Sequence, residues 1–405
     1  MTRRWPWIAI AALVLAVLAV QTWNKAHRPD GNDLTSYLLS ARALWDGHSP
    51  YSPDTPFPYV YPMLLAFLLV PWIAVPYGVA VLAWFGLSVL ALALVLAQTT
   101  DGRPLSVAIT AAVTFAAIQN TLLNGQVNFF VVLCCVLAVA AARTDRDASA
   151  GAWLGAGVAL KLMPALLGLF FVVRRRGTAI GSAGLVAIAL SLVPAVMLGR
   201  DAWDAYAEYA REFLMPTLRE PASVRQDPLV FSVAGVVHRW IAPAAPGWVD
   251  AVAALAVVGA VAGADMLRWR RVGDDRAAGA AYLLAIVLVS PKSEVHHLAF
   301  AIPAVAVCWT RWLSGETSGD RGSLAALLGG SLALMGARLA GPAQGAVICG
   351  GLLLVGAALV ALSPSSASPR GNRRSSSPSR SDRAAAPWLP PATAARAPSA
   401  GPRSD

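Results

Sequence analysis

The sequence predicts an all-α, polytopic membrane protein, and two observations carry this prediction. Of the 405 residues, 57% are hydrophobic and only 13% are charged, about half the charged fraction of an average soluble domain. Apolar runs of about 16–22 residues recur along most of the chain, and each approaches the roughly 20 residues that cross a bilayer as a helix. A transmembrane β-barrel would instead alternate apolar and polar residues, and the sequence shows no such pattern.

About twelve runs are expected to be transmembrane helices. They cover approximately residues 5–22, 60–76, 77–98, 104–119, 127–142, 150–173, 178–198, 248–267, 277–291, 296–313, 323–340 and 344–362. The first run follows Arg3 and Arg4 and could be a cleaved signal peptide. No clear A-x-A cleavage site follows it, which favours a retained span.

Basic residues orient these spans. With Arg3 and Arg4 in the cytoplasm and every run crossing, the clusters at 174–176 and 268–271 and the C-terminal tail all fall on the cytoplasmic side, as the positive-inside rule requires. Both termini of this multi-pass plasma-membrane protein are then cytoplasmic. The segments placed outside are loops 23–59 and 199–228 and the stretch SPKSEVHH at 290–297. This count assigns segment 120–127 to the cytoplasmic side. Segment 228–241 is too short to cross and is placed at the outer interface.

Each long outer loop contains a pattern of apolar residues at helical spacing. In loop 23–59 the pattern runs from Leu34 to Trp45, and Gly47 is well placed to end the helix. In loop 199–228 the residues that share one helical face are Trp203, Tyr206, Ala210 and Phe213. These patterns predict juxtamembrane helices that lie on the outer membrane surface with aromatic residues at the headgroup level.

The net charge of +10 does not indicate a nucleic-acid partner, because half of it lies in the tail. Residues 363–405 hold seven Arg and two Asp among Ser, Pro and Ala. Such a segment cannot bury a core, so we expect a transmembrane domain over residues 1–362 and a disordered cytoplasmic tail. Contact of the tail with anionic lipid is the alternative. The four cysteines lie in apolar stretches without CxxC spacing and are interpreted as small core residues.

Asp33 is a candidate for chemistry at the outer surface. It lies directly before the periodic residues of the first outer loop, where an N-cap is expected. Its structural role would be to cap the first-turn amides, a contribution of about 1 kcal/mol. Its functional role would be that of a general base. The two roles are compatible, because a cap hydrogen bond also fixes the direction of the carboxylate.

Lys161 lies near the middle of the apolar run 150–173. A lysine at that depth costs at least about 2.5 kcal/mol, so we expect a partner or an anionic ligand rather than a merely tolerated charge. Gly155 and Gly157 precede it and allow close helix approach. Pro164 follows it and loosens the helix locally.

Two polar stretches interrupt the apolar pattern. Asn124, Gln126 and Asn128 surround Gly125, and they must pair internally or line a wet cavity unless they form an ordinary loop with helix caps. The stretch SPKSEVHH carries Lys292, Glu294, His296 and His297 at the outer end of a span. Adjacent histidines point to different helix faces and lack the i,i+4 spacing of a helical zinc pair. No P-loop, GxGxxG, HExxH or GxSxG motif is present, so no nucleotide-binding signature is found.

Several stretches, in this order, resemble one family. They are GNDLTSY, ARALWDGHSPY, FPYVYP, NGQVNFF, AGAWLGAGVALKLMPALLGLFFVVRRR and SPKSEVHHLAF. Over roughly residues 5–360 the chain resembles the glycosyltransferase 87 family (DUF2029), membrane glycosyltransferases of the GT-C fold. Members use polyprenyl-phosphate mannose or polyprenyl-phosphate arabinose outside the membrane. The chain departs from the family at 225–228, where relatives often have Asn-Gln-Ser, and before His296, where they often have an aromatic residue.

The resemblance implies a reaction and a set of site residues. Asp33 would take the proton from an acceptor hydroxyl that displaces the lipid phosphate with inversion. The residues expected to bind the donor phosphate or sugar are Lys161, Arg225, Lys292, His296, His297, Asn124 and Gln126. Those expected to support the acceptor or the loop are Tyr37, Arg42, Tyr51 and Tyr59. No metal or other cofactor is expected. The partners would be membrane lipids, the lipid-linked donor and a lipid-anchored glycan acceptor.

Other functions remain open from the sequence. Mannose is the favoured sugar and arabinofuranose is the runner-up. A transporter or flippase for a lipid-linked sugar would place its polar residues near the midplane in two related halves, whereas most of the polar candidates here lie on one outer face and no clear repeat is found. A non-catalytic scaffold would leave Lys161 and the polar cluster unexplained.

Overall fold

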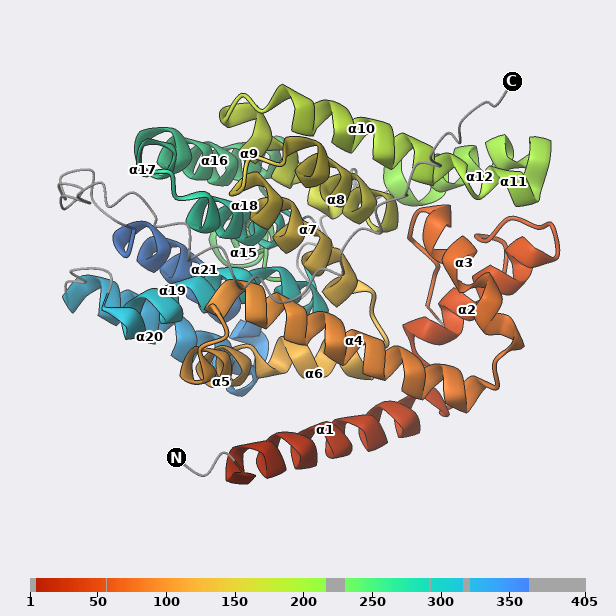
Figure 1. Ribbon diagram of the computed structural model, residues 1–405, viewed down its shortest axis with the longest axis horizontal. Coiled ribbons are helices and arrows are strands. Elements are labelled where there is room, and N and C mark those ends of the chain that lie inside the picture. The colour runs from red at the N-terminus through yellow and green to blue at the C-terminus, as the bar shows by residue number, and fades with distance from the viewer. Residues whose placement is uncertain (1–4, 56, 216–229, 291–292, 316–320, 364–405) are drawn as a thin grey trace, which may run out of the picture. The chain divides into compact units, whose positions relative to one another are not determined.

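The computed structural model describes residues 5–55, 57–215, 230–290, 293–315 and 321–363 (Figure 1). No strand occurs in these ranges, which confirms the all-α class. The elements of the first part are α1 (Trp5–Ala26), α2 (Asp33–Trp45), α3 (Met63–Leu69), η1 (Val70–Ala74), α4 (Tyr77–Thr100), α5 (Pro104–Val113), α6 (Phe115–Leu123), α7 (Asn128–Ala142), α8 (Asp147–Leu160), η2 (Met163–Leu167), α9 (Gly168–Val173) and α10 (Gly177–Leu192).

The remaining elements complete the bundle. They are α11 (Ala195–Leu198), η3 (Gly199–Asp201), α12 (Ala202–Glu208), η4 (Tyr209–Leu214), α15 (Val233–Val236), η5 (Val237–Ile241), α16 (Trp248–Ala264), η6 (Asp265–Trp269), α17 (Arg270–Val272), α18 (Asp275–Val289), η7 (Val295–Ala301), α19 (Ile302–Ser314), α20 (Arg321–Gly336), η8 (Ala337–Ala343) and α21 (Gln344–Ala361). The expected disordered tail lies outside the described residues, apart from Ser363.

Five helical segments in the described ranges are long and apolar enough to cross a membrane. They are Ala9–Ala26, Tyr77–Thr100, Gly177–Leu214, Trp248–Val272 and Arg321–Ala361. A sixth is possible if α5 and α6, which are bent by 71° at Thr114, form one span. The expected count of about twelve is not confirmed, because several apolar runs form shorter helices such as Asn128–Ala142.

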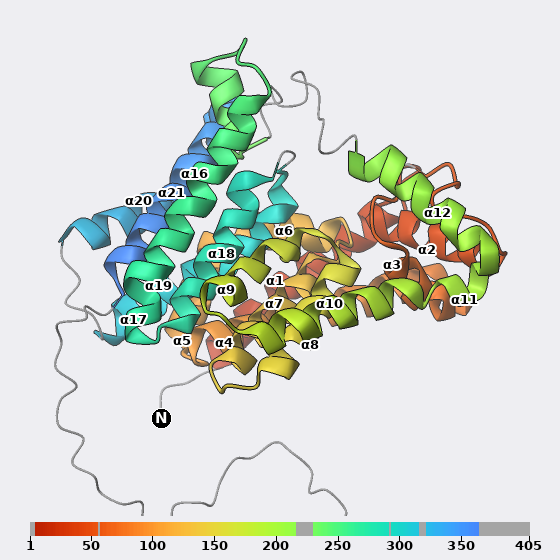
Figure 2. The same ribbon diagram turned by 90° about the horizontal axis from the view of Figure 1, so that it is seen from above.

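The bundle has two ends of different chemistry, joined by α7, α8 and α18. At one end, Lys161 after α8 contacts Asn128 at the start of α7. At the other end, Arg176 pairs with Asp147 at the start of α8. The 15 residues of α7 correspond to about 22 Å at 1.5 Å per residue. We call the end with Lys161 and Asn128 the Asp33 end, and the end with Arg176 and Asp147 the arginine end. Figures 1 and 2 both show α2, α3 and α12 grouped together on one side of the view.

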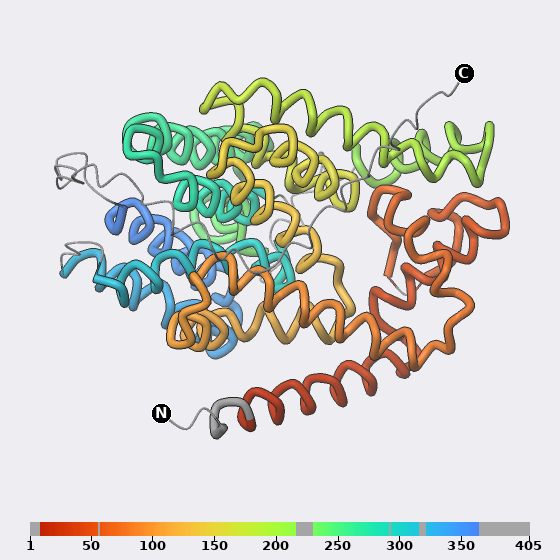
Figure 3. The backbone as a smooth tube through the Cα atoms, in the orientation of Figure 1, coloured from red at the N-terminus to blue at the C-terminus, as the bar shows by residue number. Residues whose placement is uncertain are grey.

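The run 60–76 does not carry the chain to the other end, contrary to expectation. Met63–Ala74 is only twelve residues long and packs on α2. The Tyr77 hydroxyl at the start of α4 donates to the carbonyl oxygen of Ala26 at the end of α1, at 2.9 Å. The chain therefore enters α4 at the same end at which it left α1, as the tube in Figure 3 lets the reader follow.

Because the run 60–76 does not cross, the side assigned to segment 120–127 is also wrong. The expectation that the run 150–173 is a single span is wrong as well. The backbone N–H of Asp33 donates to the carbonyl oxygen of Asn124 at 3.0 Å, so segment 120–127 lies beside loop 23–59 and not on the opposite side. The run 150–173 is not one helix. It breaks at Lys161, whose backbone is extended (φ −157°, ψ 130°), and Pro164 lies in the η2 turn that follows. Lys161 is therefore at a helix end and not at mid-span.

Close helix approach at the glycines of α8 is confirmed. A Cβ added at Gly155 would lie 2.5 Å from the carbonyl oxygen of Ala183 on α10. The two helices pack backbone against backbone, which is the role of small residues at helix interfaces in membranes. This contact holds α8, and with it the position of Lys161, against the long helix α10.

Candidate active site

The candidate site begins at the N-terminus of α2, where the structure corrects the expected cap. Asn32, not Asp33, is the N-cap: its side chain accepts a hydrogen bond from the Thr35 backbone N–H, and the Thr35 hydroxyl accepts one from the Asn32 N–H. This reciprocal pair is a capping box. Asp33 is the first helical residue, and its carboxylate is not used as a cap. The helix itself ends as expected, with Gly47 at φ +78°.

The polar turn 124–126 docks on this helix start. Besides the bond from Asp33 to Asn124, the Asn32 amide donates to the Leu123 carbonyl oxygen at 3.3 Å, and the indole of Trp84 donates to the Gly125 carbonyl oxygen at 2.8 Å. Gly125 has φ +62°, and an added Cβ would lie 2.9 Å from the Cβ of Leu34. Glycine is needed here for both the backbone angle and the close approach.

We expect Gly125→Ala to destabilise the protein by about 2–3 kcal/mol, through left-handed strain and overpacking against Leu34, and to lower the transfer rate. Thermal unfolding and sugar transfer would be measured together. Gly102→Ala is the matched control, because Gly102 has φ +65° with nothing within 4 Å of an added Cβ. Equal losses in the two variants would mean that the contact with α2 adds nothing.

Gln126 links the turn to a cluster of buried tyrosines. Its side-chain oxygen accepts hydrogen bonds from the hydroxyls of Tyr61 (2.8 Å) and Tyr37 (3.3 Å). A side-chain hydrogen bond with Gln126 also lowers the pKa of the Asp33 carboxyl. The rings of Tyr37 and Tyr61 meet edge to face at 5.1 Å. Gln126 is thereby fixed in one orientation, and it fixes the Asp33 carboxylate in turn.

The surroundings of Asp33 set its proton affinity. Burial raises the pKa of Asp33 to about 6, against lowering by the hydrogen bond from Gln126 and by the charges of Lys161 and Lys25. The charge of Glu294 raises it further. The residue keeps partial solvent exposure. A carboxylate of this kind is ionised at neutral pH and has more proton affinity than an ordinary aspartate, as general-base catalysis requires.

Lys161 supplies a buried cation near this carboxylate. Only 9% of the residue is exposed. Its Nζ donates to Asn128 Oδ1 at 2.9 Å and lies 5.3 Å from the centroid of the Tyr61 ring. An ammonium has three donors, and Asn128 is the only hydrogen-bond acceptor that Nζ has among the residues described. Two donors therefore remain for an anion.

Residues 294–297 of the SPKSEVHH stretch lie beside the start of α7. The backbone carbonyl oxygen of His296 accepts from the Asn128 amide at 3.0 Å, which ties η7 to α7 and Lys161. His297 Nδ1 accepts from the Glu294 N–H at 3.0 Å, so a neutral His297 carries its proton on Nε2. The two imidazole rings lie 4.2 Å apart. The rings are in contact, so the two side chains do not point to different faces of a helix as the sequence predicted.

Sequence reasoning gave no role to several residues that lie in this network. Lys25, at the end of α1, donates to Asn124 Oδ1 and its charge acts on Asp33. Asn32 and Tyr61 were not singled out, and Asn128 and Glu294 were noted as polar but not assigned to the site. These four lie in quoted stretches, but only the fold shows that the stretches meet. Lys25 was the harder one to find, because it lies three residues after the apolar run 5–22 and outside those stretches.

The remaining expected residues are separate from Asp33. Arg42 is exposed on the outer face of α2. The hydroxyls of Tyr51 and Tyr59 donate to the carbonyl oxygens of Tyr61 and Pro62, at 3.0 and 2.9 Å, and so brace the loop before α3. Arg225 and Lys292 lie outside the described residues.

Residues 202–214 pack on the loop 23–59. Glu208 on α12 accepts from the Ser49 hydroxyl at 2.6 Å, and Tyr209 stacks on Tyr51 with ring centroids 5.3 Å apart. A helix is present over 202–214, as expected, and its place on the outer membrane surface stays a prediction. Trp203 is 70% exposed.

A carboxylate with raised proton affinity thus lies close to a buried ammonium at one end of an apolar helical bundle. The chain belongs to glycosyltransferase family 87, whose family model matches residues 59–291. It is a glycosyltransferase, and the resemblance inferred from the sequence is confirmed.

Characterised relatives act on lipid-linked mannose. The chain is 29% identical over 339 residues to a polyprenol-phosphate-mannose-dependent alpha-(1-2)-phosphatidylinositol mannoside mannosyltransferase of Mycobacterium tuberculosis, covering 75% of this chain and 76% of the relative. It is 29% identical over 338 residues, 78% of each chain, to the corresponding pentamannoside mannosyltransferase of Mycolicibacterium smegmatis. No solved structure matches the chain.

Proposed function

We propose that this glycosyltransferase moves a mannosyl unit from polyprenyl-phosphate mannose to a hydroxyl of a lipid-anchored glycan, with Asp33 as general base. The observation that carries the proposal is the meeting of Asp33, Gln126 and Lys161 at the Asp33 end. The donor and the sugar are favoured because the relatives described above depend on polyprenol-phosphate mannose. Arabinofuranose is the second choice.

In the proposed step, the acceptor oxygen attacks the anomeric carbon of the donor as its proton passes to the Asp33 carboxylate. The bond from that carbon to the phosphate oxygen breaks, and the polyprenyl phosphate leaves with the electron pair. The two open donors of Lys161 would stabilise the charge that develops on the phosphate. A single displacement inverts the anomeric carbon. The step needs no metal ion or other cofactor.

We propose that the Asp33 end faces outward. The supporting observation is the charge at the arginine end, where Arg174 pairs with Asp265 and Asp275 and Arg311 pairs with Asp274. Basic clusters beside spans favour the cytoplasmic side. A one-sided polar site also argues against the transport alternative, which favours polar groups near the midplane.

The donor assignment is tested with labelled sugar in membranes that contain the wild-type chain. Polyprenyl-phosphate mannose and polyprenyl-phosphate arabinose would be supplied separately, with native lipid extract as acceptor. We expect transfer of mannose to lipid. Transfer of arabinose alone would replace the mannosyl assignment, and transfer from neither donor by folded protein would contradict this donor class.

The raised pKa of Asp33 also predicts a stability effect. The pKa of this carboxyl is about 6 in the folded protein and about 3.9 in the unfolded chain. Its contribution to the free energy of unfolding is therefore fully present below pH 3.9 and is lost as the pH rises to 6. Asp33→Asn should therefore raise the free energy of unfolding by about 1–2 kcal/mol at pH 8. Thermal unfolding at pH 8 and pH 4 would be compared. If Asp33→Asn were more stable than the wild type by the same amount at pH 4 and at pH 8, the prediction would be contradicted.

A further inference from the structure

A polar cavity of about 200 Å³ lies at the arginine end, away from the candidate active site. It opens between the turn after α4, the end of α7, the start of α18 and α19. Its lining residues are Asp101, Arg143, Gly273, Asp274, Asp275, Arg276, Val307, Thr310 and Arg311. Ligand pockets for drug-sized molecules measure about 300–1,000 Å³, so this cavity suits a single headgroup rather than a nucleotide.

The three carboxylates of the lining are already engaged by arginines. Arg276 donates to both oxygens of Asp101, at 2.7 and 2.5 Å, and Arg311 donates to both oxygens of Asp274 at 2.6 Å. Asp275 pairs with Arg174 and Arg176, which do not line the cavity. The acids therefore hold the arginines in place and offer little free negative charge.

Two donors in the lining are not engaged. The guanidinium of Arg143 makes no side-chain hydrogen bond or ion pair with the described part of the chain. Thr310 is 4% exposed, and its hydroxyl has no partner among the same residues. Arg143 is exposed, so water can satisfy its guanidinium, whereas the buried Thr310 hydroxyl calls for a ligand or an ordered water. Together Arg143 and Thr310 provide a charged donor and a neutral donor in one cavity.

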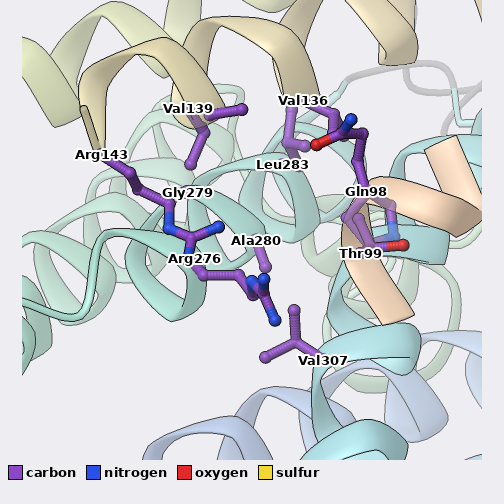
Figure 4. Close-up of a pocket in the computed structure, with 12 residues that line it drawn as sticks. Gln98, Thr99, Val136, Val139, Arg143, Arg276, Gly279, Ala280, Leu283 and Val307 are labelled. Carbon is purple, nitrogen blue, oxygen red and sulfur yellow. The ribbon is translucent and has the colours of Figure 1, made fainter. Parts of the chain in front are cut away.

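An apolar recess adjoins the polar cavity and shares Arg143, Arg276 and Val307 with it. Figure 4 shows the side chains of Arg143 and Arg276 extending into the same space, with Val139 and Val307 on either side. The other apolar residues that line the recess are Val136, Ala140, Gly279, Ala280, Leu283 and Pro303. A site that is polar at one end and apolar at the other matches an amphiphile better than a free ion.

We propose that this pocket binds the phosphate headgroup of an anionic membrane lipid from the leaflet at the arginine end. Arg143 and Thr310 donate to the phosphate oxygens, and the first methylenes of the lipid lie along the recess beside Val139 and Leu283. Basic pockets between membrane helices are suited to anionic headgroups. The pairing of the lining carboxylates with arginines disfavours a cation as the ligand.

The test is native mass spectrometry of the full chain in mild detergent, titrated with phosphatidylglycerol or phosphatidylcholine. We expect phosphatidylglycerol to bind more tightly. Arg143→Gln should weaken its binding about tenfold and Thr310→Val about threefold. Thr310→Val keeps the side-chain shape and removes an unpaired hydroxyl, so its fold should be retained. Arg146→Gln is the matched control, since Arg146 is exposed like Arg143 and lies in the same turn but does not line the cavity.

Three results would overturn the proposal. Phosphatidylcholine could bind as tightly as phosphatidylglycerol, or Arg146→Gln could weaken binding as much as Arg143→Gln, which would mean a general charge effect. Inorganic phosphate at millimolar concentration could displace the lipid completely, which would identify free phosphate as the ligand. None of these outcomes depends on the glycosyl-transfer reaction at the opposite end.

Discussion

Asp33→Asn should lower kcat for mannosyl transfer by about 10²- to 10⁴-fold, the range for loss of a positioned general base. The amide keeps the size of the side chain but cannot accept the acceptor's proton. The fold should survive, because Asn32 and Thr35 cap α2 without Asp33. The measurement is the rate of labelled mannose transfer at saturating donor, with thermal unfolding recorded on the same preparation.

Asp30→Asn is the control for this variant. Asp30 is an exposed carboxylate in the same loop, three residues before Asp33, so it reports any general effect of a lost charge. We expect near-normal transfer by Asp30→Asn. A folded Asp33→Asn protein with transfer within about threefold of wild type would show that Asp33 is not the base.

Lys161→Met should lower kcat by about 10²- to 10³-fold, because one cationic donor to the leaving phosphate is lost. Methionine has a similar length and carries no charge. Burial of the Lys161 ammonium is itself costly, so we expect the main loss in rate, and thermal unfolding of the same preparation reports any loss of stability. The donor KM should rise less than kcat falls, since the charge on the bridging oxygen develops in the transition state.

Lys161→Arg separates charge from packing. It keeps the cation near Asn128 and the Tyr61 ring, and we expect it to recover part of the lost rate. Equal rates for the Met and Arg variants would show that the charge does not act on the reaction. Full activity of Lys161→Met would remove Lys161 from the donor site.

Helix α2 could be predicted from the sequence because its signals are local. Leu34, Tyr37, Ala41 and Leu44 recur at helical spacing and are all buried in the structure, and Gly47 takes the left-handed backbone that ends the helix. The cap was wrong by one residue. Asn32 and Asp33 are both good N-caps, and only the bond to Thr35 decides between them.

The assembly of the site could not be predicted in the same way. Met63–Ala74 and Asn128–Ala142 are both short apolar helices, and length and hydropathy do not say which of them returns to the end where it began. One such error reverses the side assigned to the segments that follow, until the chain reversal at Lys161 restores it. It placed segment 120–127 opposite Asp33, although the two are hydrogen-bonded.

The position of Lys161 illustrates the same limit. Pro164 signalled a loosened backbone, but a proline in an apolar run is compatible with a kinked span as well as with a chain reversal. The reversal is decided by contacts that are distant in sequence, from Lys161 to Asn128 and from Gly155 to Ala183. These contacts bring the lysine to the level of Asp33.

The most direct test of Asp33 as the base is the pH dependence of kcat/KM for mannosyl transfer by the wild-type chain. The donor phosphodiester does not titrate near neutral pH, so a rising limb reports a group of the free enzyme. We expect that limb to have an apparent pKa of about 6, the value that burial gives Asp33, and to persist in His296→Gln. A profile that stays flat between about pH 4.5 and 8, or a limb that disappears in His296→Gln, would contradict Asp33 as the base.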